Sequence, residues 1–411
     1  MTQTTAAKGP AYPQVVVDSD AASIVEEVLS SLTVTATAGE PHPELRLTRL
    51  TIELGPDDSL DALLAELRRR IAEQNGGWLP SIGKDREASS PMVTGYSRIM
   101  SFTPTVVPVD AHGGHPRVVA VGGPSSAHGG IPKIMAIPPA IYSESPGADD
   151  VGYEILSTSP ATSDDFHPPV DGGVRIGWID TELADLEVAP GGDAADAWRA
   201  HSAFVRDLIR QVAPDAEEPV LRGVLKERGG RGDLWDVAVA MVDLVLHAKV
   251  DILLLPLATY TADGLPPLLL RRALEVISGR CLIIAAAGNQ LVMDGWKRDR
   301  CRTTASWPAA FPQVRAVAAR FDGPSHPLPQ WVDAFTPSAY FEARFFTGMV
   351  RIEADTPATE FYGAATWAGT SFSAAHAAGL VAARMSATGL TATQAWDALV
   401  AEGEQLILDQ P

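Results

Sequence analysis

The sequence predicts an α/β fold with a mostly parallel sheet, preceded by a smaller α+β unit. From residue 174 onward, apolar runs of strand length alternate with amphipathic runs of helix length. Such alternation is typical of a parallel sheet that is covered by helices on both faces. Upstream, a strand-like run and an amphipathic helical run form a separate pattern. At 411 residues, the chain is long enough for two or three domains.

Changes in composition divide the chain into four predicted segments. The first residues have the polar composition of a disordered tail, and a later stretch is rich in Pro, Ser, Asp and Gly, as linkers are. The segments are a tail at 1–14, an α+β domain of unknown role at 15–143, a linker or connecting arm at 144–173 and the parallel-sheet domain at 174–411.

The N-terminal domain contains two clear elements. Residues 45–54 are apolar at roughly every second position, which predicts a strand. The run 60–71 places its large apolar residues on one helical face, with cap candidates at 57–59 and a closing Asn-Gly at 75–76. Nothing in this domain indicates a chemistry. Two further strands are predicted, at 117–121 and 133–137.

The C-terminal domain begins with a buried strand that ends in a carboxylate, Asp180. In parallel sheets, catalytic groups gather at the carboxyl ends of the strands, so Asp180 and Asn289, which follows a later strand, are candidate site residues. The predicted elements are strands at 174–180, 252–255 and 281–287 and helices at 201–212, 233–248 and 266–278.

The charge of the chain argues against nucleic acid as a partner. It has 32 basic and 51 acidic residues, a net charge of −19, and no Lys/Arg-rich run that would attract a polyanion. Its start lacks the apolar core of a signal peptide, and no later stretch is long enough to span a bilayer. We therefore expect a cytoplasmic protein with no membrane partner, in which Cys281 and Cys301 are reduced. No cofactor is expected, and the oligomeric state stays open.

The most informative segment is 367–379, which reads Trp-Ala-Gly-Thr-Ser-Phe-Ser-Ala-Ala-His-Ala-Ala-Gly. It places Ser371 where a glycine turn becomes a helix, among free backbone N–H groups and at the positive end of the helix dipole. A hydroxyl there can attack a carbonyl while those donors stabilise the developing oxyanion. Taken alone, a serine before an alanine-rich run is more often a helix N-cap.

A nucleophilic serine needs a base, and nine histidines compete for that role. His376 is close in sequence, but five residues along a helix turn it about 140° away from Ser371. A metal site in the glycine-rich loops is not favoured, because no carboxylate or cysteine repeats the spacing of their histidines, His112, His115 and His128. His201 opens a predicted helix and is a further candidate, although taken alone it would more often be a partly buried histidine at a helix start.

Four motifs occur in one order along the chain: Asp180-Thr181, His201 with its helix, Ala286-Ala287-Gly288-Asn289 and Gly369-Thr370-Ser371. Together they resemble the subtilisin-like serine peptidases (subtilases), most closely the actinobacterial members that lack a signal peptide. The resemblance covers about residues 170–411. The order Asp, His, Ser also separates the chain from chymotrypsin-like and α/β-hydrolase arrangements.

The resemblance implies a three-layer subtilisin-like domain and an intracellular serine endopeptidase that works through an acyl-enzyme. It implies a protein or peptide substrate, with a dedicated processing enzyme for one precursor or partner as a narrower version. The implied roles are Ser371 as nucleophile, His201 as general base, Asp180 as the group that orients it, Asn289 as oxyanion donor, and Leu255, Pro256, Leu257 and Ala258 as the substrate-binding strand. No metal ligand is implied.

Several positions depart from the family pattern. Glu182, Ser202 and Asp207 stand where the family usually has glycine, Pro256 alters the substrate strand, and Ala375 replaces a common proline. These departures leave open a catalytically weak or inactive subtilase-fold protein that binds peptides as a scaffold. The N-terminal domain is either a pro-segment that assists folding and inhibits, or a recognition domain.

Overall fold

The structure is a computed structural model that describes residues 13–55, 58–89, 100–101, 173–261, 264–289, 305–319, 329–336, 340–352, 357–403 and 406. The predicted tail, the strands at 117–121 and 133–137, the linker before residue 173, three histidines (His112, His115 and His128) and Cys301 lie outside the described residues.

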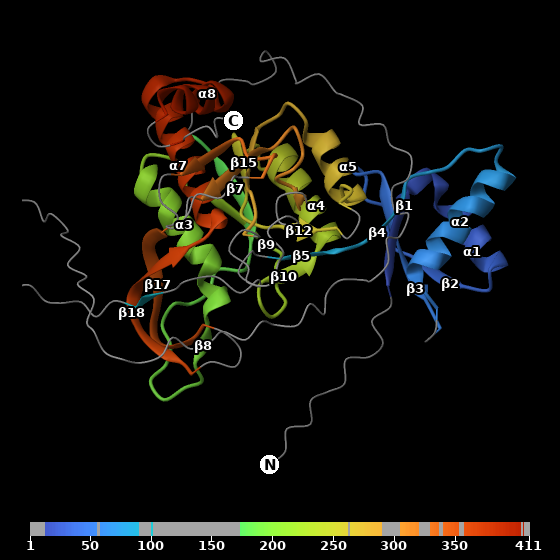
Figure 1. The fold of residues 1–411 in the computed structure, drawn as a ribbon, viewed down its shortest axis with the longest axis horizontal. Coiled ribbons are helices and arrows are strands. Elements are labelled where there is room, and N and C mark those ends of the chain that lie inside the picture. Colours follow the sequence, from blue (N-terminus) through green and yellow to red (C-terminus); the bar gives the residue numbers. More distant parts are fainter. Residues whose placement is uncertain are drawn as a thin grey trace, which may run out of the picture.

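The larger domain is built on a six-stranded parallel sheet (Figure 1). Neighbouring strands pair in parallel with regular register, such as Ile252 with Ile176 and Leu255 with Ala285. This sheet confirms the predicted fold class. In spatial order the strands are β16 (Ala334–Thr336), β15 (Arg315–Ala319), β13 (Leu282–Ala286), β11 (Ile252–Leu255), β7 (Ile176–Asp180) and β9 (Val220–Gly223).

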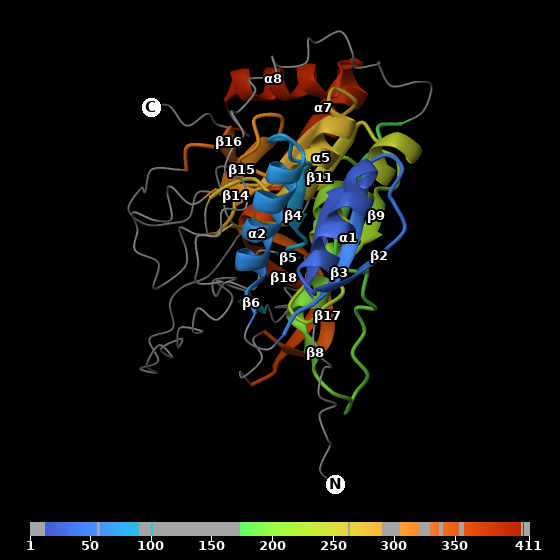
Figure 2. The same cartoon turned by 90° about the vertical axis from the view of Figure 1, so that its right-hand side faces the viewer.

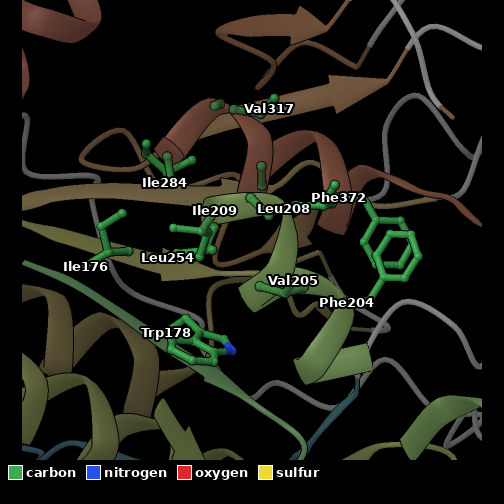
Figure 3. Close-up of a cluster of buried hydrophobic side chains, with 14 of the residues drawn as sticks. Ile176, Trp178, Phe204, Val205, Leu208, Ile209, Leu254, Ile284, Val317 and Phe372 are labelled. Atoms are coloured by element: carbon green, nitrogen blue, oxygen red, sulfur yellow. The ribbon is translucent and has the colours of Figure 1, made fainter. Parts of the chain in front are cut away.

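Helices cover both faces of this sheet, because alternate strand residues point to opposite sides. Ile252 and Leu254 of β11 pack against α3 (His201–Val212) and α7 (Thr370–Thr388). Leu253 and Leu255 pack on the other face, against α4 (Leu234–Val242) and α5 (Leu268–Ile277). Figure 3 shows the first face, where Leu208 and Ile209 of α3 face the strand residues Leu254 and Ile284. The domain is therefore a three-layer α/β structure, as predicted.

The predicted helices occur with modest changes at their ends. The helix expected at 201–212 is confirmed with the same limits, and the one expected at 266–278 is observed as α5. The segment 233–248 forms α4 and continues as a π-helical turn at Asp243–His247. The chain also forms a helix that the sequence reading did not assign, α8 (Ala392–Glu402), which begins with a capping box at Thr391.

A second sheet of the larger domain was not anticipated from the sequence. Its centre is a long antiparallel hairpin of β17 (Tyr340–Arg351) and β18 (Thr359–Ala368), and β18 leads directly into α7. Two short strands complete this sheet, β8 (Ala195–Asp196) on β17 and β6 (Met100–Ser101) on β18. Two small two-stranded sheets pair β10 (Arg231–Asp233) with β5 (Glu87–Ser89) and β12 (Thr259–Tyr260) with β14 (Ser306–Trp307). Short 3-10 turns lie at Ser19–Ala21 and Ala197–Ala200.

The N-terminal unit is a βαββαβ fold with the antiparallel strand order β2-β3-β1-β4, the arrangement called ferredoxin-like. Both helices pack on one face of its sheet (Figure 2). The predicted strand and helix at 45–54 and 60–71 correspond to β3 and α2. In chain order the elements are β1 (Gln14–Asp18), α1 (Ala22–Ser31), β2 (Thr35–Ala38), β3 (Leu47–Glu53), α2 (Leu60–Gln74) and β4 (Ile82–Lys84).

The other face of the N-terminal sheet packs against α4 and α5 of the larger domain. Val16, Leu45 and Leu47 are fully buried in one apolar cluster with residues of these helices. At the same interface, the guanidinium of Arg272 lies 2.8 Å from the carboxylate of Asp18. Strands β5 and β6 lie within the segment 15–143 and pair with strands of the larger domain. Among the described helices, none combines the length and apolar character needed to cross a membrane.

Candidate active site

The predicted aspartate and histidine lie in direct contact. Nδ1 of His201 is 2.8 Å from both carboxylate oxygens of Asp180. Both side chains are buried, with exposures of 0% for Asp180 and 1% for His201. The backbone N–H of Thr181 donates to Asp180 at 2.7 Å and fixes the carboxylate from the other side. A carboxylate on Nδ1 sets the tautomer in which Nε2 is free to accept a proton.

The sheet and one helix explain why these two residues meet. Asp180 is the last residue of β7, a strand buried over its whole length, and His201 is the first residue of α3. Helix α3 packs on the face of the sheet that also carries α7, and its start lies over the carboxyl end of β7. A second side-chain contact joins the same two elements, since the indole N–H of Trp178 donates to the hydroxyl of Ser202 at 3.3 Å.

Ser371 lies at the start of α7, where the backbone N–H groups of the first turn have no partners within the helix. Its side chain is 2% exposed, and its hydroxyl donates to the backbone carbonyl of Pro256 at 3.0 Å. The next residue, Phe372, contacts the ring of His201 with a centroid distance of 5.3 Å. The structure therefore brings the starts of α3 and α7 together, with Ser371 and His201 on adjacent helix termini.

Aromatic side chains enclose the imidazole of His201. Trp367 meets it edge-on at a centroid distance of 5.8 Å, and Phe204 packs on Phe372 at 4.6 Å. Phe204 and Phe372 lie side by side in Figure 3. This apolar surround limits the ring to the orientation that the Asp180 contact selects, and it keeps bulk water away from the Asp–His pair.

Asn289 follows β13 and is held by the threonine that precedes Ser371. Its Oδ1 accepts two hydrogen bonds of 3.0 Å from Thr370, one from the backbone N–H and one from the hydroxyl. The hydroxyl of Thr370 in turn accepts from the N–H of Gly288 at 3.2 Å. These two contacts fix which end of the amide is the oxygen and hold the side chain of Asn289 next to the start of α7. Sequence reasoning included Thr370 in its motif but assigned it no role.

The predicted substrate strand also borders Ser371. Leu255 ends β11, and Leu257 and Ala258 are buried just beyond it. The carbonyl of Pro256 points at the serine hydroxyl. Proline lacks only the N–H, so the Pro256 carbonyl can still accept a hydrogen bond, which in the structure comes from Ser371.

The structure accounts for three departures near His201. Ser202 accepts the hydrogen bond from Trp178. Asp207 accepts from the backbone N–H of Arg344 at 2.9 Å and so links α3 to β17. Glu182 lies against Gly223, and its carboxylate is 3.6 Å from the ammonium of Lys226. Each bulky or polar replacement therefore has a specific partner.

Other candidates do not join this site. His376 stacks on Phe341 of β17 at a centroid distance of 5.3 Å, away from the serine, as its helical position predicted. Burial raises the pKa of the free Cys281 thiol to about 12, so this thiol stays protonated. Among the described residues, no group of His, Cys, Asp and Glu side chains is arranged to hold a metal ion.

Comparison with solved structures identifies the type of fold. No protein-family model and no curated protein matches the sequence. The crystal structure of fervidolysin from Fervidobacterium pennivorans, a keratinolytic enzyme related to subtilisin, is similar over 96% of this chain. The TM-score is 0.54 at 13% identity, and this chain spans 58% of the fervidolysin chain. This likeness shows that the chain has a subtilisin-like fold.

Two smaller matches come from peptide-processing enzymes. A lanthipeptide protease and the patellamide maturation protease PatA each align with 56% of this chain at 19% identity. These alignments cover 80% and 86% of those chains, with TM-scores of 0.42 and 0.39.

Proposed function

We propose that the chain is a serine endopeptidase that cleaves peptide bonds through Asp180, His201 and Ser371. The observation that carries this proposal is the buried contact between Asp180 and His201 at the end of β7, beside a serine at a helix start. A structural histidine has no need of a buried carboxylate on one nitrogen and an aromatic enclosure next to a helix-terminal serine. The subtilisin-like fold agrees with this assignment.

In the proposed reaction, Oγ of Ser371 attacks the scissile carbonyl while Nε2 of His201 accepts its proton. Asp180 stabilises the imidazolium that forms. The tetrahedral intermediate then breaks its C–N bond, and His201 gives the proton to the departing amine. Water, activated by the same imidazole, hydrolyses the ester of Ser371 and restores the hydroxyl.

The oxyanion of the tetrahedral intermediate would lie between two donors, the amide nitrogen of Asn289 and the backbone N–H of Ser371. The contacts from Thr370 support this role, because they fix the amide of Asn289 by its oxygen beside the start of α7. A donor that is oriented before the reaction stabilises charge without a cost of reorganisation.

The hydrogen bond from Ser371 to Pro256 belongs to the site without substrate. A peptide that extends along residues 255–258 brings backbone N–H groups, and one of these can take over the Pro256 carbonyl as acceptor. The serine hydroxyl is then released, and rotation about its Cα–Cβ bond takes it toward His201. Recognition of this kind reads the backbone, so a protein or peptide substrate fits better than a small ester.

The alternative is a subtilase-fold scaffold that binds peptides without cleaving them. The replaced glycines near His201 motivated that alternative. The partners found for Glu182, Ser202 and Asp207 weaken it, because these replacements leave the Asp180–His201 contact intact.

A covalent probe tests the proposal. Purified protein is treated with a fluorophosphonate, and labelling is followed by intact mass. We expect one adduct that is lost in Ser371→Ala and kept in Ser386→Ala, which changes an exposed serine of the same helix. A folded wild-type protein that never labels would overturn the endopeptidase and favour the scaffold. A peptide-library digest with the same two variants would then define the specificity, and cleavage confined to one narrow motif would support a dedicated processing enzyme.

A second proposal concerns the N-terminal domain, which we assign as a pro-segment. Strand β5 pairs with β10 and contacts β12, the strand that follows the Pro256 segment. Strand β6 pairs with Ala365 and Thr366 of β18, shortly before Ser371. Both strands therefore lie next to segments that border the candidate site, which supports a role of this part of the chain at the site.

Mass spectrometry of the purified protein tests this assignment. We expect wild-type protein to contain a fragment that starts between Ser89 and Met100, and Ser371→Ala protein to remain uncut there. An uncut wild-type protein that nevertheless labels with the probe would favour a recognition domain instead.

A further inference from the structure

We propose that the hydrogen bond between Trp178 and Ser202 holds Asp180 and His201 in position. Trp178 and Ser202 are then positioning residues for catalysis. This inference rests on the proposed endopeptidase function. It assigns a role to Ser202 at the position where the resembling family usually has glycine.

The geometry of the contact supports this role. Trp178 lies on β7 two residues before Asp180, and Ser202 directly follows His201 on α3. Their hydrogen bond of 3.3 Å therefore joins the same strand and helix as the Asp180–His201 contact, two residues away on β7 and one residue away on α3. Both side chains are buried, at 1% and 0% exposure, so water does not compete for this bond.

The start of α3 has few other polar restraints. Ala200 occupies the N-cap position, and no side chain caps this end of the described helix. Serine, threonine or aspartate usually holds a helix start in place. Here the polar side-chain contacts to the first turn are His201 with Asp180 and Ser202 with Trp178. Without the Trp178–Ser202 contact, the first turn of α3 can shift against the apolar side chains that it packs on. His201 would move with it.

A small shift of the imidazole matters because proton transfer from Ser371 depends on distance and alignment. Displacements of about 1 Å can lower rates about a hundredfold. The substrate strand at 255–258 belongs to β11 and its extension, not to α3. Loss of the Trp178–Ser202 bond is therefore expected to lower kcat and leave KM nearly unchanged.

The test uses full-length protein with Ser202→Ala, Trp178→Phe and the double variant, and Thr48→Val as control. Ser202→Ala removes the acceptor, and Trp178→Phe removes the donor but keeps an aromatic ring. Thr48→Val breaks a side-chain hydrogen bond of 3.0 Å to Ser19, far from the site in the N-terminal domain. kcat and KM are measured on a peptide from the library digest, with the folded fraction determined for each variant.

We expect kcat to fall about tenfold in both single variants, with KM within about twofold of wild type. The double variant should be no slower than the worse single variant, because both changes remove one shared bond. A purely structural bond would lower the melting temperature of these variants while kcat per folded molecule stayed at the wild-type value. That result, or full additivity of the two changes, would overturn the inference.

A spectroscopic measurement separates this inference from the proposed function. The Nδ1 proton of His201 in its bond to Asp180 is expected to give a low-field proton resonance that exchanges slowly with water in wild type. The signal should broaden and exchange at least several-fold faster in Ser202→Ala and Trp178→Phe, and remain unchanged in Thr48→Val. If the wild type proves inactive, this resonance still shows whether the Trp178–Ser202 bond holds the Asp180–His201 pair. The same signal in wild type, Ser202→Ala and Trp178→Phe would refute the inference.

Discussion

The orientation of a single amide decides whether Asn289 can stabilise an oxyanion. An asparagine side chain presents a donor at one end and an acceptor at the other, and only the donor end serves an anion. Thr370 resolves this choice, because its N–H and hydroxyl both donate to the amide oxygen. Thr370, which precedes the proposed nucleophile Ser371, therefore also fixes the amide orientation of the proposed oxyanion donor Asn289.

Replacing Asn289 should affect the chemical step far more than substrate binding. We expect Asn289→Ala to lower kcat about 10²- to 10³-fold, the usual effect of losing one oxyanion donor, with KM within about twofold. Steady-state kinetics on a cleaved peptide measure both constants. A rise in KM with unchanged kcat would place Asn289 in ground-state binding instead.

Thr370 can be tested separately from Asn289. Thr370→Val keeps the shape of the side chain but removes the hydroxyl that holds the amide, so we expect a smaller fall in kcat, about tenfold. Thr370→Ser keeps the hydroxyl and serves as the matched control, with kcat near wild type. Equal losses in both variants would show that the methyl group, not the hydroxyl, matters.

At the scale of elements, the small residues of α7 allow α3 to approach closely. A Cβ on Gly379 would lie 2.9 Å from Cβ of Val212 and 3.4 Å from the carbonyl oxygen of Ile209. This close approach brings the starts of the two helices together, and with them His201 and Ser371. Helix–helix distance and site geometry are thus set by the same residues.

This packing leads to a prediction that opposes helix propensity. In an exposed helix, replacing glycine by alanine stabilises by about 1 kcal/mol. At Gly379 the new methyl group has no room, so we expect Gly379→Ala to destabilise by about 1–3 kcal/mol. Denaturant unfolding measures the change, and Gly379→Ala should destabilise less in a Val212→Gly background, where the Cβ of residue 212 is absent. Stabilisation by Gly379→Ala alone would contradict the packing argument.

At the scale of the whole molecule, a buried carboxylate lies between the two domains. Oδ1 of Asp85, just after β4, accepts from the backbone N–H of Trp235 at 3.1 Å, at the start of α4. Arg49 faces the carboxylate at 3.2 Å, with a side-chain exposure of 2% for Asp85. Burial raises the pKa of Asp85 to about 7, and the nearby Asp233 and Asp236 add to the rise, although Arg49 lowers it.

The raised pKa gives the assembled protein a pH dependence with a defined sign. Folding and docking favour protonated Asp85, so this stabilisation is fully present below the ordinary pKa near 4 and is lost as the pH rises through 7. A pKa rise from 3.8 to about 7 corresponds to about 4 kcal/mol between the two limits. We expect wild-type protein to lose stability between about pH 4 and pH 7, as measured by denaturant unfolding.

Asp85→Asn should flatten this part of the pH dependence, because the amide resembles the protonated acid and does not titrate. Asp193→Asn, on an exposed loop, is the charge-matched control and should keep the wild-type slope. Burial also raises the pKa values of Asp251 and Asp333, but these contribute equally to both proteins and cancel in the difference. An identical slope in wild type and Asp85→Asn would show that Asp85 does not control the interface.

Much of the larger domain was predictable, because its signals are local. Buried strands such as β11 are continuous apolar runs, α3 has a regular apolar face, and both patterns can be read within about a dozen residues. The candidate site residues were also predictable, since they follow strand ends or begin helices. Fewer elements of the N-terminal unit were predicted from the sequence. Its β3 and α2 were predicted, while β1, α1, β2 and β4 were not.

The sequence by itself determined the α/β class, the order of the main elements and the candidate site residues. Tertiary structure decided the ferredoxin-like strand order, the β17–β18 hairpin and the partners of the atypical residues. The physical reason is the sequence distance of the contacts. Ser202 meets Trp178 across 24 residues, Asp207 meets Arg344 across 137 and Ser371 meets Pro256 across 115. Local periodicity carries no information about such pairs, which form only when the sheet and its covering helices have packed.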